Sequence, residues 1–284
     1  MISRRAFLQA SSAAAAFGRF ARAAKLGDIG VQLYTVRTVL PAKMEETLGA
    51  IEAAGYREIE ATWAGLDKLV EAMKSTRLKP VSVHLDSKMI GTGSADELAQ
   101  AVEQAKSGGF RYAVHPYVPP AERGGLDAMK TLAEKLNRAG EKFQAAGIAL
   151  CYHNHAFEFE PLQGTTPFQT LLENTDSKLL GIELDAFWVS VAGHDPAELL
   201  RKLSGRVPLL HVKDKAAGTP NLFAEGVPRT AFKEAGQGVL DWPKVLGAAR
   251  TAGVKHYFVE QDQTPGDPVE SLRQSYSYLA KLDY

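Results

Sequence analysis

The chain of 284 residues contains a single cysteine, Cys151, so it cannot form an internal disulfide. Cys151 lies in the apolar run "IALCY", which favours a small core residue over an exposed, reactive thiol. An excess of either charge is also missing, because 33 basic residues balance 33 acidic ones. This balance does not support nucleic-acid binding, which a basic excess would favour, or disorder, which an acidic excess would favour.

Two further features are missing after residue 26. No linker, low-complexity segment or charge run divides the chain, which indicates one domain. The first apolar run, "GVQLYTVR", lacks the G-x-G-x-x-G pattern that marks a dinucleotide-binding open sheet.

The N-terminus has the anatomy of an export signal. "SRRAFL", with Arg4 and Arg5, precedes an Ala-rich segment that ends in "ARA", and the start resembles a twin-arginine signal. We therefore expect residues 1–23 to be a signal peptide and 24–284 to be the mature protein. The twin-arginine translocase would then export it, already folded, to the periplasm, a route that suits a protein loaded with metal beforehand. The alternative is an Ala-rich cytosolic helix.

Alternating periodicities dominate the rest of the chain. Eight runs rich in β-branched and apolar residues predict strands, at 29–34, 58–61, 80–85, 112–116, 148–153, 180–185, 207–214 and 257–262. Between them, apolar residues at spacings of three and four predict helices, one of which starts at Asp195-Pro196 and ends at Gly205. Strict alternation predicts parallel strands, and eight units in about 250 residues fit a single closed (β/α)₈ barrel.

Polar side chains gather at the C-terminal ends of these strands, where such barrels hold their active sites. The set comprises Gln32, Tyr34, Glu60, Trp63, His84, His115, His153, His155, Glu158, Glu183, Asp185, His211, Lys213, Asp214, Glu260 and Asp262. Histidines converging from several strands favour a site over isolated core histidines. Buried carboxylates are costly unless they are paired or bind a metal.

Four of these residues, one from each of the last four strands, form a plausible metal set: Glu158, Asp185, His211 and Glu260. Three carboxylates and one imidazole suit one Mn²⁺, Mg²⁺, Co²⁺ or Zn²⁺ ion, with room for two substrate oxygens. His153 or His155 could replace Glu158. Because side chains alternate along a strand, both histidines share a face, and we expect them to point to the substrate while Glu158 reaches the metal.

The motifs "YHNHAFEFEP", "GIELDAFWVSVAGHDP", "RVPLLHVKD", "EAGQGVLDW" and "VEQDQT" resemble the sugar phosphate isomerase/epimerase family, which has a xylose-isomerase-like barrel. The resemblance covers essentially the whole mature chain and is strongest from Cys151 to Asp262. It implies one divalent metal held by the four residues above, in that order. It also implies that Glu158 and Glu260 act as bases on opposite faces of a sugar, beside a metal-stabilised enediolate.

Metal-dependent apurinic endonucleases share this barrel and histidines such as His84 and His115, but use three metals. The sequence departs from their pattern, with "DAFW" at 185–188 in place of Asp-x-x-His and no Asp-x-His after "HVKD". We therefore expect one metal and no nuclease activity.

The remaining candidates concern the substrate. Lys213 could stabilise an oxyanion or protonate a leaving hydroxyl, or it could be a surface lysine paired with Asp214. Trp63 and Trp188 could stack on a sugar ring or pack at the barrel rim. The residues expected to contact substrate are Gln32, His84, His115, His153, His155 and Trp188.

Three functions fit this pattern. The first is a sugar isomerase or epimerase, and the second is a keto-sugar or keto-inositol dehydratase, or a 3-keto-glycoside lyase, using the same metal. The third is a periplasmic sugar-binding protein without turnover. Because an exported protein would rarely meet a sugar phosphate, we expect a free sugar, a keto-sugar, an inositol-like ring or a 3-keto-glycoside. A homo-oligomer is common for such barrels.

Overall fold

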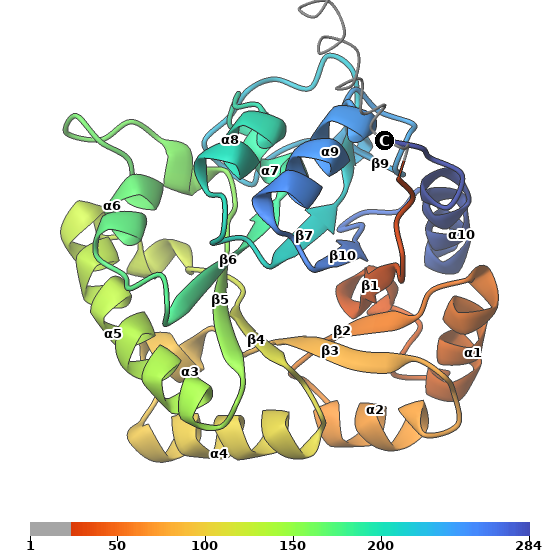
Figure 1. Ribbon diagram of the computed structural model, residues 1–284, viewed down its shortest axis with the longest axis horizontal. Coiled ribbons are helices and arrows are strands. Elements are labelled where there is room, and N and C mark those ends of the chain that lie inside the picture. Colours follow the sequence, from red (N-terminus) through yellow and green to blue (C-terminus); the bar gives the residue numbers. More distant parts are fainter. Residues whose placement is uncertain (1–23) are drawn as a thin grey trace, which may run out of the picture.

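A computed structural model describes residues 24–284, and the predicted signal at 1–23 lies outside the described residues. Its centre is a closed barrel of parallel strands, which confirms the predicted single (β/α)₈ architecture (Figure 1). The strands are β1 (Gly30–Gln32), β2 (Glu58–Thr62), β3 (Lys79–His84), β4 (Tyr112–His115), β5 (Ala149–His153), β6 (Leu180–Asp185), β7 (Leu209–Val212) and β10 (His256–Val259). Strand β10 closes the ring on β1, with Gly30 opposite Phe258.

Helices surround the strands as an outer layer (Figure 1). They are α1 (Met44–Ala54), α2 (Leu66–Met73), α3 (Lys88–Gly91), α4 (Ala95–Ser107), α5 (Gly125–Ala145), α6 (Pro167–Glu173), α7 (Ala186–Val191), α8 (Pro196–Lys202), α9 (Trp242–Ala252) and α10 (Pro268–Leu279), with 3₁₀ turns η1 (Leu33–Val36), η2 (Pro120–Glu122), η3 (Phe157–Phe159) and η4 (Arg229–Ala231). The predicted start of α8 is confirmed, because Asp195 accepts a hydrogen bond from the Ala197 amide at 2.8 Å. Helices α2, α3, α6 and α7 were not predicted from the sequence.

The segment predicted as one strand, 207–214, divides into two elements. After β7 the chain turns into β8 (Asp214–Lys215), which pairs antiparallel with β9 (Phe232–Lys233). The buried Asp214 carboxylate causes the turn, since it accepts hydrogen bonds from the amides of Lys215, Gly236 and Leu240 and from the Trp242 indole. A Cβ at Gly238 would collide with this carboxylate, so the "EAGQG" loop needs glycine there.

The barrel interior has an apolar floor and a polar upper part. Val81, Val114, Cys151, Leu209 and Phe258 form the floor as one buried cluster. The core placement predicted for Cys151 is therefore confirmed. Glu60, Glu183, His153 and His211 are buried at the level above. Because residues two apart on a strand share a face, Cys151 and His153 point inward at successive levels.

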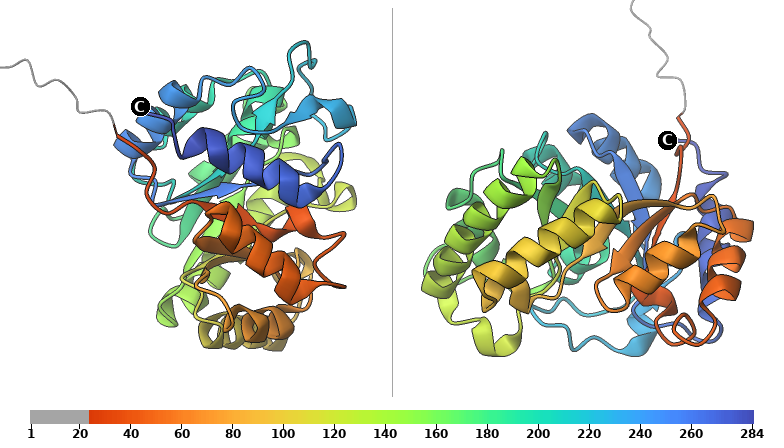
Figure 2. Two further views of the ribbon diagram at one scale, coloured as in Figure 1. Left: turned by 90° about the vertical axis from the view of Figure 1, so that its right-hand side faces the viewer. Right: turned by 90° about the horizontal axis from the view of Figure 1, so that it is seen from below.

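The first and last described residues lie side by side at the amino end of the barrel (Figure 2). Ala24 and Tyr284 exchange two backbone hydrogen bonds of 2.9 and 3.0 Å. Helices α1 and α10 pack together nearby, where the Tyr56 and Tyr276 rings meet edge to face.

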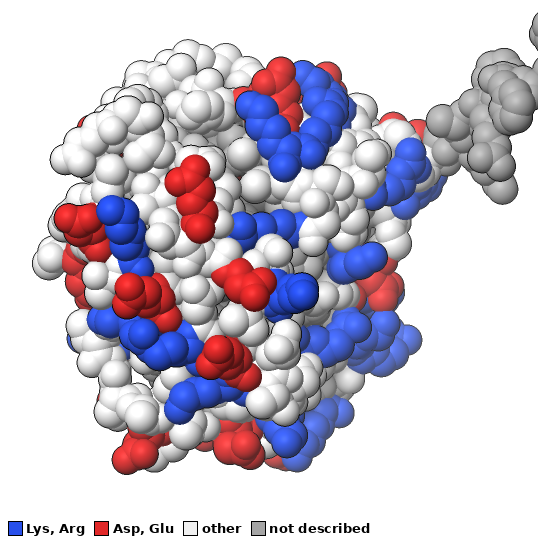
Figure 3. All heavy atoms as spheres, turned by 60° about the vertical axis from the view of Figure 1, so that its left-hand side comes forward, with Lys and Arg blue, Asp and Glu red and all other residues white. Residues whose placement is uncertain are grey.

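Acidic and basic side chains intermingle on the face shown in Figure 3, in keeping with the balanced composition. Within residues 24–284, no helix combines the length and apolar character that crossing a membrane requires.

Candidate active site

A cavity of about 510 Å³ opens at the carboxyl end of the barrel. It is lined by Tyr34, Thr62, Trp63, His84, Leu85, Pro116, Tyr117, His153, His155, Trp188, Glu225, Val227, Arg229, Phe232, Glu260, Asp262 and Gln263. Because parallel strands deliver their C-terminal residues to one face, side chains from distant parts of the sequence meet here.

Four residues at the base of this cavity can hold a metal ion together. His153, Asp185, His211 and Glu260 each offer one ligand atom, and these atoms lie within 4.8 Å of one another. Asp185, His211 and Glu260 are three of the four ligands expected from the sequence. They come from the ends of β6, β7 and β10, which are neighbours in the barrel.

Glu158 does not join this group, contrary to the expected metal set. It lies in η3, beyond the end of β5, and its carboxylate accepts hydrogen bonds from the Tyr152 hydroxyl and the His155 amide, both at 2.9 Å. Tyr152 points away from the barrel interior, so the turn carries Glu158 to the outer side of the strand. His153, the alternative to Glu158 in the sequence analysis, faces inward and takes its place.

The chemistry of this set fits a divalent cation. One oxygen of Asp185, Oδ2, is buried without a hydrogen bond in the described part of the chain, although Lys213 Nζ lies 3.1 Å away. Two imidazoles and two carboxylates suit Zn²⁺, Mn²⁺ or Co²⁺ better than Mg²⁺, which prefers oxygen ligands. Burying these carboxylates would be costly unless a cation offset their charge.

A second polar layer lies directly beneath, and no role was predicted from the sequence for its two carboxylates. Glu60 and Glu183 are fully buried, and His84 Nε2 lies 3.1 Å from Glu60 and 2.7 Å from Glu183. Burial opposes a charge on His84, but attraction to the two carboxylates outweighs it and raises the pKa of His84 to about 10. The same histidine, together with His211, holds the pKa of Glu60 well below its usual range despite burial.

Lys213 is buried among carboxylates and is not a surface lysine. Its ammonium lies 2.6 Å from Glu260 Oε2 and also pairs with Asp262 and Asp185. Burial opposes its charge, but these three carboxylates raise the pKa of Lys213 well above its usual value. Lys213 is thus a protonated group at the base of the cavity, whereas Asp214, its suggested partner, faces the other way.

The residues expected to contact substrate divide into two groups. His84, His153, His155 and Trp188 line the cavity. Gln32 and His115 do not. Gln32 instead accepts a hydrogen bond from the Tyr34 amide and caps η1. On β4 the inward position belongs to Val114, so His115 points outward and stacks on Tyr152.

Aromatic rings and one ion pair shape the cavity wall. Trp63, Trp188 and Phe232 present apolar surface to it. Glu225 stands on the wall too, but Arg123 neutralises it through two hydrogen bonds of 2.6 and 3.1 Å. This pair links the long connection between β8 and β9 to the segment that follows β4.

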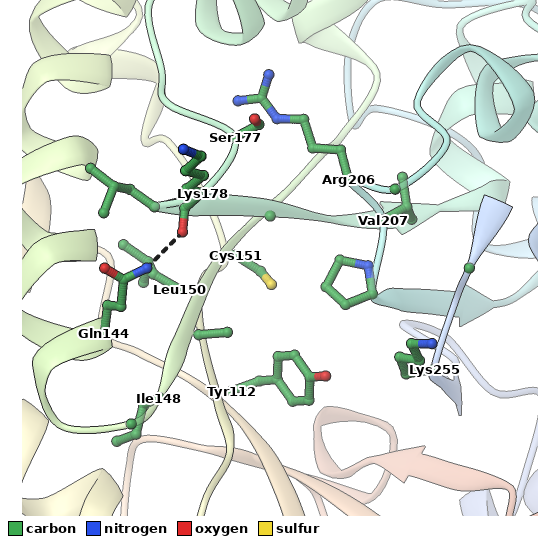
Figure 4. A pocket seen from close by; sticks show the side chains of 17 residues that line it. Tyr112, Gln144, Ile148, Leu150, Cys151, Ser177, Lys178, Arg206, Val207 and Lys255 are labelled. Carbon is green, nitrogen blue, oxygen red and sulfur yellow. Dashed lines mark hydrogen bonds between the residues drawn. The ribbon is translucent and has the colours of Figure 1, made fainter.

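A second cavity of about 490 Å³ lies at the amino end of the strands (Figure 4). Three of its lining residues are basic, namely Lys178, Arg206 and Lys255. Arg206 is committed to backbone carbonyls of Leu172 and Thr175. The amino-end cavity thus lacks the converging carboxylates and imidazoles of the carboxyl end.

Comparisons with known proteins bear on the fold and the family. The inosose dehydratase of Clostridium perfringens is 30% identical over 160 residues, which are 53% of this chain and 53% of that enzyme, so the match spans about half the length of each. A sugar phosphate isomerase/epimerase structure from Parabacteroides distasonis has a TM-score of 0.75 at 24% identity, covering 91% of this chain and 96% of that one. The structure of the IolI protein with a zinc atom has a TM-score of 0.69 at 16% identity, covering 88% and 96%.

At these identities the two structures support the fold alone. The family model described as "Xylose isomerase-like TIM barrel" matches residues 20–282, nearly the whole sequence. Together with the closed barrel and the cluster at its carboxyl end, this match shows that the chain belongs to the xylose isomerase-like TIM barrel family.

Proposed function

We propose that this protein is a metal-dependent carbon–oxygen lyase that removes water from a keto-polyol of the inosose type. One observation carries the choice between lyase and epimerase. Two-base epimerisation expects carboxylates on both faces of the substrate, yet Glu158 lies outside the cluster. The cluster instead holds Glu260 beside a protonated lysine, Lys213, and its other carboxylate, Asp185, also pairs with this lysine. One base and one acid suit elimination.

His153, Asp185, His211 and Glu260 would hold the metal. When bound, a divalent cation supplies Lewis-acid stabilisation of negative charge on substrate oxygens. These residues also hold the base of the cavity rigid, because all four are at least nine-tenths buried.

Glu260 and Lys213 would divide the proton transfers. Lys213 and His211 keep the pKa of Glu260 low despite its burial, so its carboxylate is ionised and can accept a proton from the carbon beside the ketone. The electron pair of that C–H bond first passes into the ketone as an enolate, and it then forms the new C=C bond as the β-hydroxyl leaves. Lys213 donates a proton to this hydroxyl, which departs as water, and the proton held by Glu260 can then restore Lys213.

The cavity wall would orient the ring. Trp63 and Trp188 offer flat apolar surfaces that suit the C–H faces of a polyol, while the polar base receives its oxygens. The volume of about 510 Å³ accommodates a monosaccharide-sized ring with neighbouring water. The name of the Clostridium perfringens relative supports an inosose as substrate.

A sugar epimerase is the second candidate, because His155 could serve as another base. His155 lines the cavity, and its Nδ1 has no hydrogen-bond partner within 24–284. Burial lowers the pKa of His155 to about 4, so its ring is neutral at pH 7 and able to accept a proton.

The test combines metal analysis with solvent-isotope exchange. The mature protein is purified, its bound metal is counted, and it is incubated in deuterated water with inososes, ketoses and 3-keto-glycosides while NMR follows the products. A lyase gives an unsaturated or dicarbonyl product from an inosose, with one metal per chain. Deuterium incorporation with inverted configuration and no loss of water would instead identify an epimerase, and no bound metal would reject both.

We also propose that the twin-arginine translocase exports the protein to the periplasm. Arg4 and Arg5 are the sequence features that support this. Replacing both with lysine should leave the precursor in the cytoplasm, as cell fractionation would reveal. Unchanged export of this variant would reject the proposal.

A further inference from the structure

Each of the two imidazoles in the metal cluster has a carboxylate on its far nitrogen. His211 directs Nδ1 to Glu260 at 3.1 Å, and its Nε2 lies 2.6 Å from Glu60. His153 directs Nε2 toward Asp185, and its Nδ1 lies 3.0 Å from Glu183. The arrangement is therefore duplicated, with one supporting carboxylate for each imidazole.

This pairing determines which nitrogen of each ring is free. A carboxylate accepts a proton and cannot donate one, so Glu60 requires Nε2–H on His211, and Glu183 requires Nδ1–H on His153. With a cation in the cluster, the nitrogens that remain, Nδ1 of His211 and Nε2 of His153, would be the ones that direct lone pairs toward it. A metal-binding histidine commonly donates its other N–H to a carboxylate, which fixes the ring and makes it a stronger ligand.

We propose that Glu60 and Glu183 are positioning residues that set the tautomer and ring plane of His211 and His153 for metal binding. This inference rests on the metal site of the proposed function. The two carboxylates are held in turn by His84, whose Nε2 lies between them. Neither carboxylate lines the cavity, so both act through the imidazoles rather than on substrate.

The lower layer also has the composition of a cation site, since His84, His153, Glu183 and His211 offer ligand atoms within 4.8 Å of one another. Its geometry favours support over a second metal. A cation there would need Nδ1 of His153 and Nε2 of His211, the nitrogens that already face Glu183 and Glu60. Filling both sites at once would require each ring to bind metal through both nitrogens, with no N–H left.

The experiment measures Co²⁺ affinity of the full chain by competition with a chelator, alongside the visible absorption of bound Co²⁺. The variants are Glu60→Gln and Glu183→Gln. The matched control is Glu58→Gln, because Glu58 stands two residues before Glu60 on β2 and makes a similar 2.7 Å contact with His256, but at the other end of the barrel. Melting temperatures of the metal-free proteins check folding.

We expect one Co²⁺ per wild-type chain, an affinity loss of about 10- to 100-fold in each of the two variants, and no change in Glu58→Gln. The Co²⁺ spectrum should also change in the two variants, which a general loss of stability would not cause. If a glutamine variant does not fold, Glu60→Asp and Glu183→Asp, which keep the charge but shorten its reach, should show the same change in part.

Several outcomes would overturn the proposal. Wild-type affinity and spectrum in both variants would reject the positioning role while leaving the proposed function intact. Two Co²⁺ ions per wild-type chain would replace it with a second metal site. Absence of any bound Co²⁺ would reject the proposed function itself.

Discussion

The two ends of the barrel carry the same kind of side-chain pair with different surroundings. At the amino end, Glu58 lies 2.7 Å from His256, and at the carboxyl end Glu60 lies 2.6 Å from His211. Glu58 and Glu60 are on one strand, two residues apart. The amino-end pair is a nearly closed unit, whereas His211 also faces Glu183, Asp185 and Glu260.

The difference shows which property marks a site in this fold. The two cavities have nearly equal volumes, about 490 and 510 Å³, so size does not distinguish them. Buried carboxylate oxygens without hydrogen-bond partners do distinguish them. In the part of the chain that the structure describes, Glu60 Oε1, Glu183 Oε1 and Asp185 Oδ2 lack hydrogen bonds, and all three lie at the carboxyl end. Natural proteins rarely leave such atoms unsatisfied without a functional reason.

The largest effect should come from breaking the carboxyl-end cluster itself. Asp185→Asn and His211→Ala each remove a ligand, so we expect bound metal to fall from one per chain to none and activity to be lost. Elemental analysis of the purified variants measures this directly. His256→Gln, at the amino end, is the control and should retain its metal. Full metal content in Asp185→Asn would place the metal elsewhere.

The next largest effect separates the catalytic step from substrate binding, and it concerns Glu260. Glu260→Gln keeps the shape of the side chain but removes the proton acceptor, so kcat should fall by about 10²- to 10⁴-fold with a much smaller change in KM. Steady-state kinetics with the metal content matched to wild type provides the measurement. A kcat equal to that of the wild type would exclude Glu260 as the base.

Lys213→Gln should separate the two steps of the reaction, which are removal of the proton beside the ketone and loss of water. Without the ammonium, the leaving hydroxyl lacks its proton donor, so water loss should slow by about 10²-fold or more while deuterium exchange beside the ketone continues. NMR in deuterated water follows both processes in one sample. Equal slowing of exchange and elimination would show that Lys213 acts on the first step.

The last effect concerns stability and pH rather than the metal or the reaction. Burial raises the pKa of Glu158 from 4.5 to about 8. Between these values the folded state holds a proton that the unfolded chain has released. The free energy of unfolding therefore falls as pH rises, by up to roughly 1.4 kcal/mol per pH unit, and the loss is complete above about pH 8.

Glu158→Gln removes this dependence, because a neutral amide can keep both contacts, to Tyr152 and to the His155 amide. Its melting temperature should exceed that of the wild type at about pH 9 and match it at about pH 5, with activity retained. Glu160→Gln, at an exposed site in the same turn, is the control and should show no such difference. A constant difference between Glu158→Gln and wild type at both pH values would contradict this explanation.

Strand periodicity was sufficient to predict the barrel and much of its site. Asp185, His211 and Glu260 lie at or directly after strand ends, where alternation of side chains fixes their direction. Glu158 follows its strand by five residues, and the intervening turn reverses the side to which it points. No periodic signal encodes that turn, so the sequence grouped Glu158 with the other candidate ligands, whereas the structure places it outside the cluster.

The other differences between the sequence-based expectations and the structure have different physical causes. Glu60 and Glu183 stand one level below the cavity, and a strand pattern does not indicate how deep a side chain lies. His115 and Gln32 were expected to contact the substrate. Whether the last residue of a strand points into the barrel, however, depends on which of its neighbours in the strand fills the barrel interior. The two-residue strands β8 and β9 are too short to leave any pattern, and the Asp214 contacts that create them are long-range.

The pairing of Ala24 with Tyr284 determines where anything attached to the barrel leaves it. Both residues lie at the amino end of the barrel, whereas the cavity opens at the carboxyl end. An affinity tag joined after Tyr284 would therefore emerge far from the opening of the cavity. A protein immobilised through this end would present its open face to solution.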